Sequence, residues 1–434
     1  MGKLKRLIKN PYTFSLISKV FGVLVGFLFT VFQARFLGSE IKGQVATVNS
    51  IVSVAAIVLA LGIYQAYPYY KRTSEADILP VFMRLALFLL AVYGVAAGAT
   101  ILLFRLPAKY IAVLIITPLM VYDSIISYVT LIEEPNRRNA TDMLVMLGEL
   151  ILVVLFWLFA SPTFVLGVLI ITVKDVTKAV IFTWWWRRRI FSPTESMWKW
   201  FPKLVRFGFF PMLSLLMATL NYRVDVIMLN GRVPDAAIGV YSIGVTVAER
   251  VWMIPDAMKG VMLSNLTKGK DANETAFVIR LCNTGCLILI LGIIALGRPF
   301  ITWVFGAEYR GAYQITLLLL MGVFSMIYYK AIANYNIAMG KQTISFVLLS
   351  VSVLSNIIAN FILIPVWGIY GAGVASVISY ALCGILFIVF FCRTTRISFG
   401  DMLLIKKSDL ARAKRRLRRG ERQPKQEAGN GEDT

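Results

Sequence analysis

Six cationic side chains of this sequence lie inside long apolar stretches, where ionised groups are rare: Lys19, Lys174, Lys178, Arg223, Arg250 and Lys330. An ionised group at depth in a membrane costs about 2.5–3.5 kcal/mol on insertion scales, so it usually faces a protein interior or a watery cavity. Lysine and arginine both bind phosphate oxygens, and arginine does so through two parallel hydrogen bonds. We therefore interpret these six residues as candidate substrate-binding residues for an anion.

The spacing of two of these cations adds to this interpretation. Lys178 follows Lys174 by four residues on one helical face, where like charges repel each other. Asp175 points to a different face, so the pair requires another anionic neighbour or a ligand. Deep carboxylates are candidates for ion pairs or for coupling to an ion gradient: Asp123, Glu149, Asp225 and Glu249. Together with Asp175 and Asp256 they equal the cations in number, so the pattern permits an anion cavity without requiring one.

Glu249 and Arg250 are adjacent, and adjacent helical positions point about 100° apart. We therefore expect Arg250 to face a cavity and Glu249 to pair with a cation on a neighbouring helix.

Enzymatic chemistry has little support in the sequence. There is no histidine, which removes the usual side chain that titrates near neutral pH and most transition-metal sites. The four cysteines lie in apolar segments and are expected to be packing residues. No nucleophile–base set and no phosphate-binding loop is recognisable, so we expect neither an enzyme nor a bound cofactor or metal.

The composition indicates the elements that position these charges. Of 434 residues, 58% are hydrophobic and 16% are charged, with a mean hydropathy of +0.73. Soluble domains have about 45–50% apolar residues and about 25% charged residues. A membrane span needs about 20 apolar residues. The sequence predicts an all-α polytopic membrane protein with about twelve spans: 12–36, 41–67, 79–103, 110–132, 140–160, 163–186, 204–228, 237–264, 275–297, 312–338, 343–364 and 370–391.

The distribution of basic residues predicts the orientation. Cytoplasmic segments of membrane proteins are enriched in lysine and arginine. With the N-terminus inside, the loops on the far side hold only Lys42, Arg105, Lys109, Arg232, Arg298 and Arg310 of the 45 basic residues. We therefore expect a multi-pass protein of the cytoplasmic membrane with both termini cytoplasmic. The run from Trp184 to Arg189 resembles an inner interfacial anchor, and the basic tail is expected to contact anionic lipid rather than nucleic acid.

The longest predicted cytoplasmic connection divides the chain into two halves. We expect a six-helix bundle at 1–186, a linker at 187–203, a second six-helix bundle at 204–392 and a basic tail at 393–434. Each half joins its first two helices through a short loop ending in a glycine, Gly43 or Gly239. Two packed bundles with a central cavity between them are typical of a transporter.

Several segments carry a resemblance to a known family. The stretch from 31 to 63 holds Ala34–Gly38, Gly43 and Leu61–Gly62. The stretch from 221 to 258 holds Asn221, Arg223, Asp225, Leu229, Gly239, Tyr241, Ser242 and Pro255. Gly306–Tyr309 and the glycines around Pro365 (Gly368, Gly371, Gly373) also match. Over about residues 12–391 the chain resembles the polysaccharide and O-antigen flippases of the multidrug/oligosaccharidyl-lipid/polysaccharide exporter superfamily.

This resemblance implies a flippase that moves a polyprenyl-diphosphate-linked oligosaccharide across the membrane by alternating access, driven by an ion gradient. It also implies other membrane proteins of polysaccharide assembly as partners. A drug or organic-cation antiporter of the same superfamily is the alternative. Such a transporter needs a cavity dominated by carboxylates and aromatic rings. The carboxylates Asp123, Glu149 and Asp225 are compatible with this alternative.

Overall fold

The computed structural model describes residues 11–267, 272–406 and 409. The regular secondary structure of this part of the chain is helical, apart from one isolated bridge between Asn230 and Val233. The first ten residues and most of the predicted basic tail lie outside the described residues. The helices are α2 (Pro11–Leu59), α3 (Tyr67–Thr73), α4 (Leu79–Leu103), α5 (Ala108–Glu133), α6 (Pro135–Phe159), α7 (Phe164–Ile190), α8 (Met197–Leu229), α9 (Asp235–Glu249), α10 (Met253–Thr267), α11 (Ala272–Phe305), α12 (Ala312–Val323), α13 (Met326–Ala338) and α14 (Gln342–Thr395).

Short 3₁₀ turns link some of these helices: η1 (Ile63–Ala66), η2 (Arg250–Trp252), η3 (Ala307–Tyr309) and η4 (Phe399–Met402). Within the described residues, eight helical segments are long and apolar enough to cross a membrane, and α12 with α13 forms a ninth such unit bent by 42°. Helix α7 is not one of these segments, because every 18-residue stretch of it contains three charged residues, Lys174, Asp175 and Lys178. The predicted all-α membrane fold is confirmed.

Helices α2 and α14 each correspond to two of the predicted spans, and a glycine separates the two spans in each helix. Helix α2 breaks at Gly38 (φ 68°, ψ 172°), and α14 breaks at Gly368 (φ 53°, ψ −127°). Glycine adopts positive φ at little cost, so each break needs one residue instead of a loop. The helix resumes directly after Gly38. The prediction that Lys42 lies in an external loop is therefore wrong, because Lys42 belongs to the second segment of α2.

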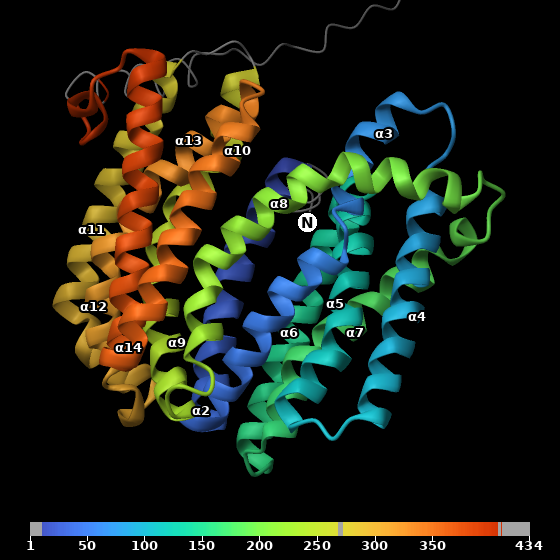
Figure 1. Ribbon diagram of the computed structural model, residues 1–434, viewed down its shortest axis with the longest axis horizontal. Coiled ribbons are helices and arrows are strands. Elements are labelled where there is room, and N and C mark those ends of the chain that lie inside the picture. Colours follow the sequence, from blue (N-terminus) through green and yellow to red (C-terminus); the bar gives the residue numbers. More distant parts are fainter. Residues whose placement is uncertain (1–10, 268–271, 407–408, 410–434) are drawn as a thin grey trace, which may run out of the picture.

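Apolar side chains form two large cores. One joins the end of the second α2 segment with α4, α5, α7 and the start of α8, and the other joins the end of α8 with α9 to α14. Figure 1 shows these two groups side by side, with α8 crossing obliquely from one to the other. Three buried cysteines, Cys282, Cys286 and Cys383, lie in the second core, as expected for packing residues. The predicted linker is largely helical, because α7 continues to Ile190 and α8 begins at Met197.

At one end of the molecule the helices of the two cores pack backbone against backbone. A methyl group added at Gly43 would lie 1.8 Å from the Asp235 carbonyl oxygen, and one at Gly239 would lie 1.9 Å from the Ser39 carbonyl oxygen. Only glycine permits so close an approach. We name this contact, made by Ser39, Gly43, Asp235 and Gly239, the closed end. Figure 1 shows α2 and α9 meeting there.

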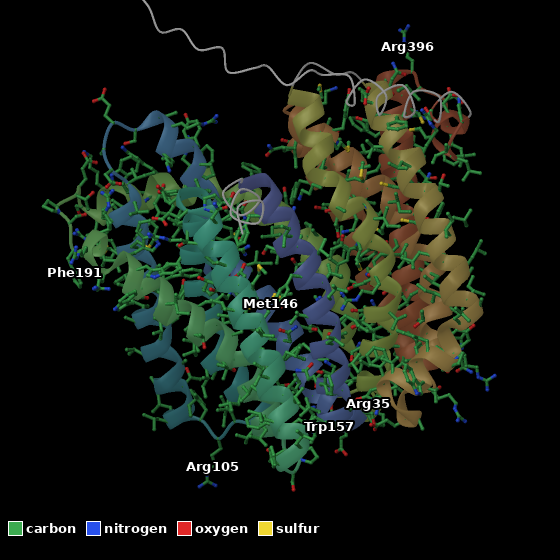
Figure 2. The ribbon with its side chains drawn as sticks, turned by 180° about the vertical axis from the view of Figure 1, so that it is seen from behind. Arg35, Arg105, Met146, Trp157, Phe191 and Arg396 are labelled. Atoms are coloured by element: carbon green, nitrogen blue, oxygen red, sulfur yellow. The ribbon has the colours of Figure 1, made fainter. Side chains whose placement is uncertain are left out.

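Polar contacts across the two groups of helices reinforce this end. Asp235 accepts from the Lys109 ammonium at 2.5 Å. Glu308 accepts from the Ser39 backbone N–H at 2.8 Å, and the Arg35 guanidinium donates to the Val304 carbonyl at 2.8 Å. Figure 2 shows Arg35 and Arg105 at this end and Arg396 at the opposite one.

Candidate functional site

The main candidate site is a central cavity of about 510 Å³ between α2, α6 and α7 on one side and α8 and α9 on the other. Met146, which lines it, lies about halfway between the two ends of the molecule (Figure 2). The wall is mixed in character. Its residues are Phe29, Thr30, Gln33, Lys42, Val45, Ala46, Asn49, Ser50, Arg138, Asp142, Val145, Met146, Glu149, Ile171, Lys174, Lys178, Arg223, Val226, Ser242, Val245 and Thr246.

The ionisable residues of this wall are mostly cations. Five basic residues line the cavity, whereas only two carboxylates do; the basic residues are Lys42, Arg138, Lys174, Lys178 and Arg223, and the acidic ones are Asp142 and Glu149. Three of the six predicted cations, Lys174, Lys178 and Arg223, are therefore brought together here. The even balance of deep charges in the sequence does not hold within the cavity, because other carboxylates point elsewhere.

The cations on α6 and α7 have acidic neighbours. Lys178 Nζ lies 2.6 Å from Asp123 Oδ2 on α5, and both side chains are almost completely buried. Lys174 Nζ lies 3.9 Å from Asp175 Oδ1 and keeps 41% of its side chain exposed. Asp123 thus supplies the anionic neighbour expected for the Lys174–Lys178 pair. It neutralises Lys178 and leaves Lys174 largely open to the cavity.

Arg223 also lines a second cavity of about 380 Å³, formed by Thr30, Arg223, Thr246, Glu249, Arg250, Trp252, Met253 and Asp256. Arg223, Thr30 and Thr246 belong to both walls, so the two cavities adjoin. Arg250 lies in the second wall, with its guanidinium carbon 5.9 Å from the centre of the Phe27 ring. Glu249 lines the same cavity, and its Oε1 has no hydrogen-bond partner among the described residues.

Glu249 and Arg250 therefore line the same cavity, although they are adjacent in the chain. The chain changes from the α-helix α9 to the 3₁₀ turn η2 at Arg250. Within the described part of the chain, Glu249 also forms no ion pair with a cation at 4.0 Å or less.

Two predicted cations lie outside these walls. Lys330 on α13 pairs with Asp256 Oδ1 at 2.9 Å and stands 4.9 Å from the Trp252 ring centre. Lys19 is exposed on the first segment of α2 and belongs to neither wall. Both residues are distinct from the cations of the central cavity, although Lys330 contacts two residues of the second wall.

Asp225 is turned away from the cavity into the second core. Its Oδ2 accepts from the Tyr241 hydroxyl and from Ser376 Oγ at 3.3 Å, and its Oδ1 accepts from the Val226 backbone N–H at 2.7 Å. One turn earlier, Asn221 Oδ1 accepts from Ser379 Oγ at 2.5 Å. These residues belong to a polar cluster buried between α8, α9 and both segments of α14: Asn221, Asp225, Tyr241, Ser352, Asn356, Asn360, Ser376 and Ser379.

Residues 10–255 match the model of a family described as polysaccharide biosynthesis protein, which is more than half of the chain. The chain belongs to this family. A search of curated protein sequences gives no significant match.

Solved structures show the fold that this family member shares. A lipid II flippase MurJ in an inward closed conformation matches with a TM-score of 0.69 at 16% identity, covering 90% of this chain and 89% of that one. An inward-facing structure of a multidrug resistance MATE family transporter of the MOP superfamily matches with a TM-score of 0.63 at 14% identity, covering 85% of this chain and 94% of that one. An outward-facing structure of a transporter with the same description matches with a TM-score of 0.59 at 15% identity, covering 90% of this chain and 97% of that one. The predicted resemblance is confirmed at the level of family and fold.

Sequence reasoning missed three charged residues of this family member's central cavity. The sequence predicts Lys42 in a loop, whereas Arg138 precedes the predicted span 140–160 and Asp142 lies at its edge. The Arg138 guanidinium pairs with Asp142 at 2.7 Å. The spacing of Arg138 and Asp142, four residues apart, is a signal for such a pair, but nothing in the sequence shows that the pair faces a cavity.

Proposed function

We propose that this protein is a flippase for a polyprenyl-diphosphate-linked oligosaccharide and that the central cavity binds the diphosphate headgroup. The observation that carries the proposal is the excess of cations on the cavity wall, five basic residues against two carboxylates. A diphosphate is a compact anion that cationic side chains bind through charge-assisted hydrogen bonds. Its sugar would cross between the two groups of helices while the polyprenyl chain stays in the bilayer.

Arg223 and Lys174 are the cations best suited to contact the headgroup. Among the described residues, no carboxylate oxygen lies within 4.0 Å of Arg223 nitrogens, and the nearest one to Lys174 is at 3.9 Å. A cation already paired at short distance, such as Lys178, gains less from a new anion. The planar guanidinium of Arg223 can hold two phosphate oxygens at once. Arg250, which has no carboxylate partner at 4.0 Å or less among the described residues, extends the same surface into the second cavity.

The proposed transport cycle is alternating access. In this cycle the closed end seals the cavity at one side, and we infer from the charge distribution of the loops that this is the external side. The protein would then bind its substrate from the cytoplasm, with both termini on that side of the cytoplasmic membrane. Reporter fusions after residues 74, 137, 200, 270 and 341 are expected to read cytoplasmic, and an external signal at residue 200 would contradict this orientation.

The buried polar cluster around Asp225 is our candidate for ion coupling. A buried carboxylate is stable when it is protonated or bound to a cation, and no basic nitrogen lies within 4.0 Å of Asp225 among the described residues. We infer that a proton or a sodium ion binds here. Asp225→Asn is expected to abolish the response of transport to an imposed pH or sodium gradient. If the response persists, coupling belongs to Glu149 or Glu249, whose carboxylates line the cavities.

Transport in proteoliposomes tests the function directly. The purified protein is reconstituted with a fluorescent polyprenyl-diphosphate-linked sugar, and its movement between leaflets is followed by quenching from outside. The matched arm replaces this substrate with an organic cation of the kind that drug antiporters carry. Movement of the lipid-linked sugar alone supports the flippase, whereas movement of the cation alone supports the antiporter.

The remaining partners follow from the same proposal. The basic tail is expected to bind anionic lipid, and the flipped product must be passed to other membrane proteins of polysaccharide assembly. Nucleic acid is not among the expected partners.

A further inference from the structure

Lys42 lies in the wall of the central cavity without an acidic partner. Its Nζ donates to Gln33 Oε1 at 2.5 Å, and Gln33 itself is buried, with 3% of its surface exposed. The break at Gly38 folds the two segments of α2 so that these two residues meet. In the described part of the chain no carboxylate oxygen lies within 4.0 Å of this ammonium group. The positive charge of Lys42 is therefore held only by a neutral amide.

The residues that follow Lys42 form the closed end. Gly43 packs against the backbone of Asp235 and Gly239. Gln44 Nε2 donates to Asp235 Oδ2 at 3.2 Å, and Lys109 occupies the other oxygen of that carboxylate. One helical turn thus presents Lys42 to the cavity and Gly43 and Gln44 to the opposite group of helices. A change in the position of this turn affects both the cavity and the closure.

Lys42 and Arg223 line one cavity from opposite sides, Lys42 from α2 and Arg223 from α8. Neither has a carboxylate partner among the described residues at 4.0 Å or less. An anion between them would contact one cation from each group of helices. A phosphate oxygen carries negative charge, whereas the Gln33 amide is neutral. The Coulomb attraction between opposite charges therefore favours a phosphate oxygen over Gln33 as the partner of the Lys42 ammonium.

We propose that Lys42 is a diphosphate-binding residue and that a diphosphate held between Lys42 and Arg223 stabilises the closed end. The proposal rests on the proposed function, because it concerns the same cavity. A ligand shifts a conformational equilibrium only by its difference in affinity for the two states. When the two groups of helices part at the closed end, the anion loses one of its two cations and is bound more weakly. Opening therefore releases the headgroup on that side.

Pyrophosphate binding to the full chain tests this assignment. The protein is placed in nanodiscs of phosphatidylcholine alone, so that no anionic lipid competes, and pyrophosphate affinity is measured by calorimetry. Lys42→Met is expected to weaken binding about tenfold and Lys42→Arg to restore most of it. Lys199→Met is the matched control, because Lys199 is exposed on α8 and pairs only with Glu195 at 2.8 Å. It is expected to leave the affinity unchanged.

Hydrogen exchange provides a readout that a merely structural lysine would not move. Pyrophosphate is expected to slow amide exchange in peptides covering residues 39–44 and 235–239 of the wild-type protein, and to have no such effect in Lys42→Met. Equal affinities of the wild type and a folded Lys42→Met variant, with binding lost in Arg223→Ala, would overturn the role of Lys42 and leave the proposed function standing. Absence of pyrophosphate binding in the wild type would overturn both.

Discussion

The charged residues on the two sides of the central cavity are arranged differently. On α6 and α7, cations and carboxylates both face the cavity, and Lys178 is paired with Asp123 behind it. On α8, Arg223 faces the cavity while Asp225, two positions later, is buried with Tyr241 and Ser376. Positions two apart on a helix point in nearly opposite directions. Helix α8 therefore separates its cation from its carboxylate, whereas on α7 the Lys178 ammonium lies next to a carboxylate.

This difference indicates two kinds of buried charge with different roles. A cation that is paired at close range mainly holds helices together, because removing either partner leaves an uncompensated charge. A cation without a partner in a cavity is free to bind a ligand. Mutations of these two kinds of cation should therefore be distinguishable: loss of a closely paired cation should lower stability, and loss of an unpaired one should lower transport.

The largest expected effect is the loss of stability in Lys178→Met. Breaking a buried ion pair by removing one partner costs about 3–5 kcal/mol, and both side chains of the Lys178–Asp123 pair are about nine-tenths buried. We expect a marked fall of the melting temperature of the purified protein. Adding Asp123→Leu should recover much of it, because the double variant leaves no unpaired charge. Lys174→Met is the control, since its nearest carboxylate oxygen is 3.9 Å away. A stable Lys178→Met protein with lost transport would place Lys178 with the ligand-binding cations instead.

The next largest effect is the loss of transport in Arg223→Ala. A hydrogen bond to a charged group contributes about 1.5–3 kcal/mol, and 1.36 kcal/mol is a factor of ten in rate, so transport should fall roughly 10- to 100-fold. Arg223→Lys keeps the charge but not the planar fork and should retain part of the activity. The melting temperature should change little. Undiminished flipping of the lipid-linked sugar by Arg223→Ala would remove this residue from the binding site.

The sequence predicted the helices well because membrane spans leave a strong signal of length and apolar content. The breaks at Gly38 and Gly368 fall between predicted spans, since glycine marks a change of direction there. The linker and Lys42 were predicted less well. Helices continue past the apolar region into polar sequence, so hydropathy alone does not locate their ends.

The site was harder to predict than the fold because a buried charge in a sequence has no partner assigned to it. Asp225 and Asp123 are both deep carboxylates, yet one joins a hydroxyl-rich cluster and the other pairs with Lys178. Which of these contacts each carboxylate makes depends on the packing of α5 against α7 and of α8 against α14. Arg223 resembled the paired cations in sequence, and its lack of a carboxylate partner among the described residues is a property of the three-dimensional arrangement.

A third prediction concerns the place where the two sides meet. Gly239→Ala puts a methyl group 1.9 Å from the Ser39 carbonyl oxygen, and overpacking of this kind costs about 1–3 kcal/mol. The closed end should therefore separate, with faster hydrogen exchange in residues 39–44 and slower net transport. Gly98→Ala is the control, because a methyl group there meets nothing within 4 Å. Unchanged exchange in Gly239→Ala would mean that the helices shift without opening.

The smallest effect is expected for Arg187→Ala at the end of α7. Arg187 stands 4.5 Å from the Trp184 ring centre and both side chains are exposed, where a cation–π contact contributes about 0.5–1 kcal/mol. Its charge lies in a run with Arg188 and Arg189, so the positive charge that anchors this helix end survives the substitution. Transport should stay within about twofold of the wild type, as measured in the same proteoliposomes as Arg223→Ala. Both variants remove one arginine, so a much larger loss in Arg187→Ala would show that total positive charge, rather than its position in the cavity, determines transport.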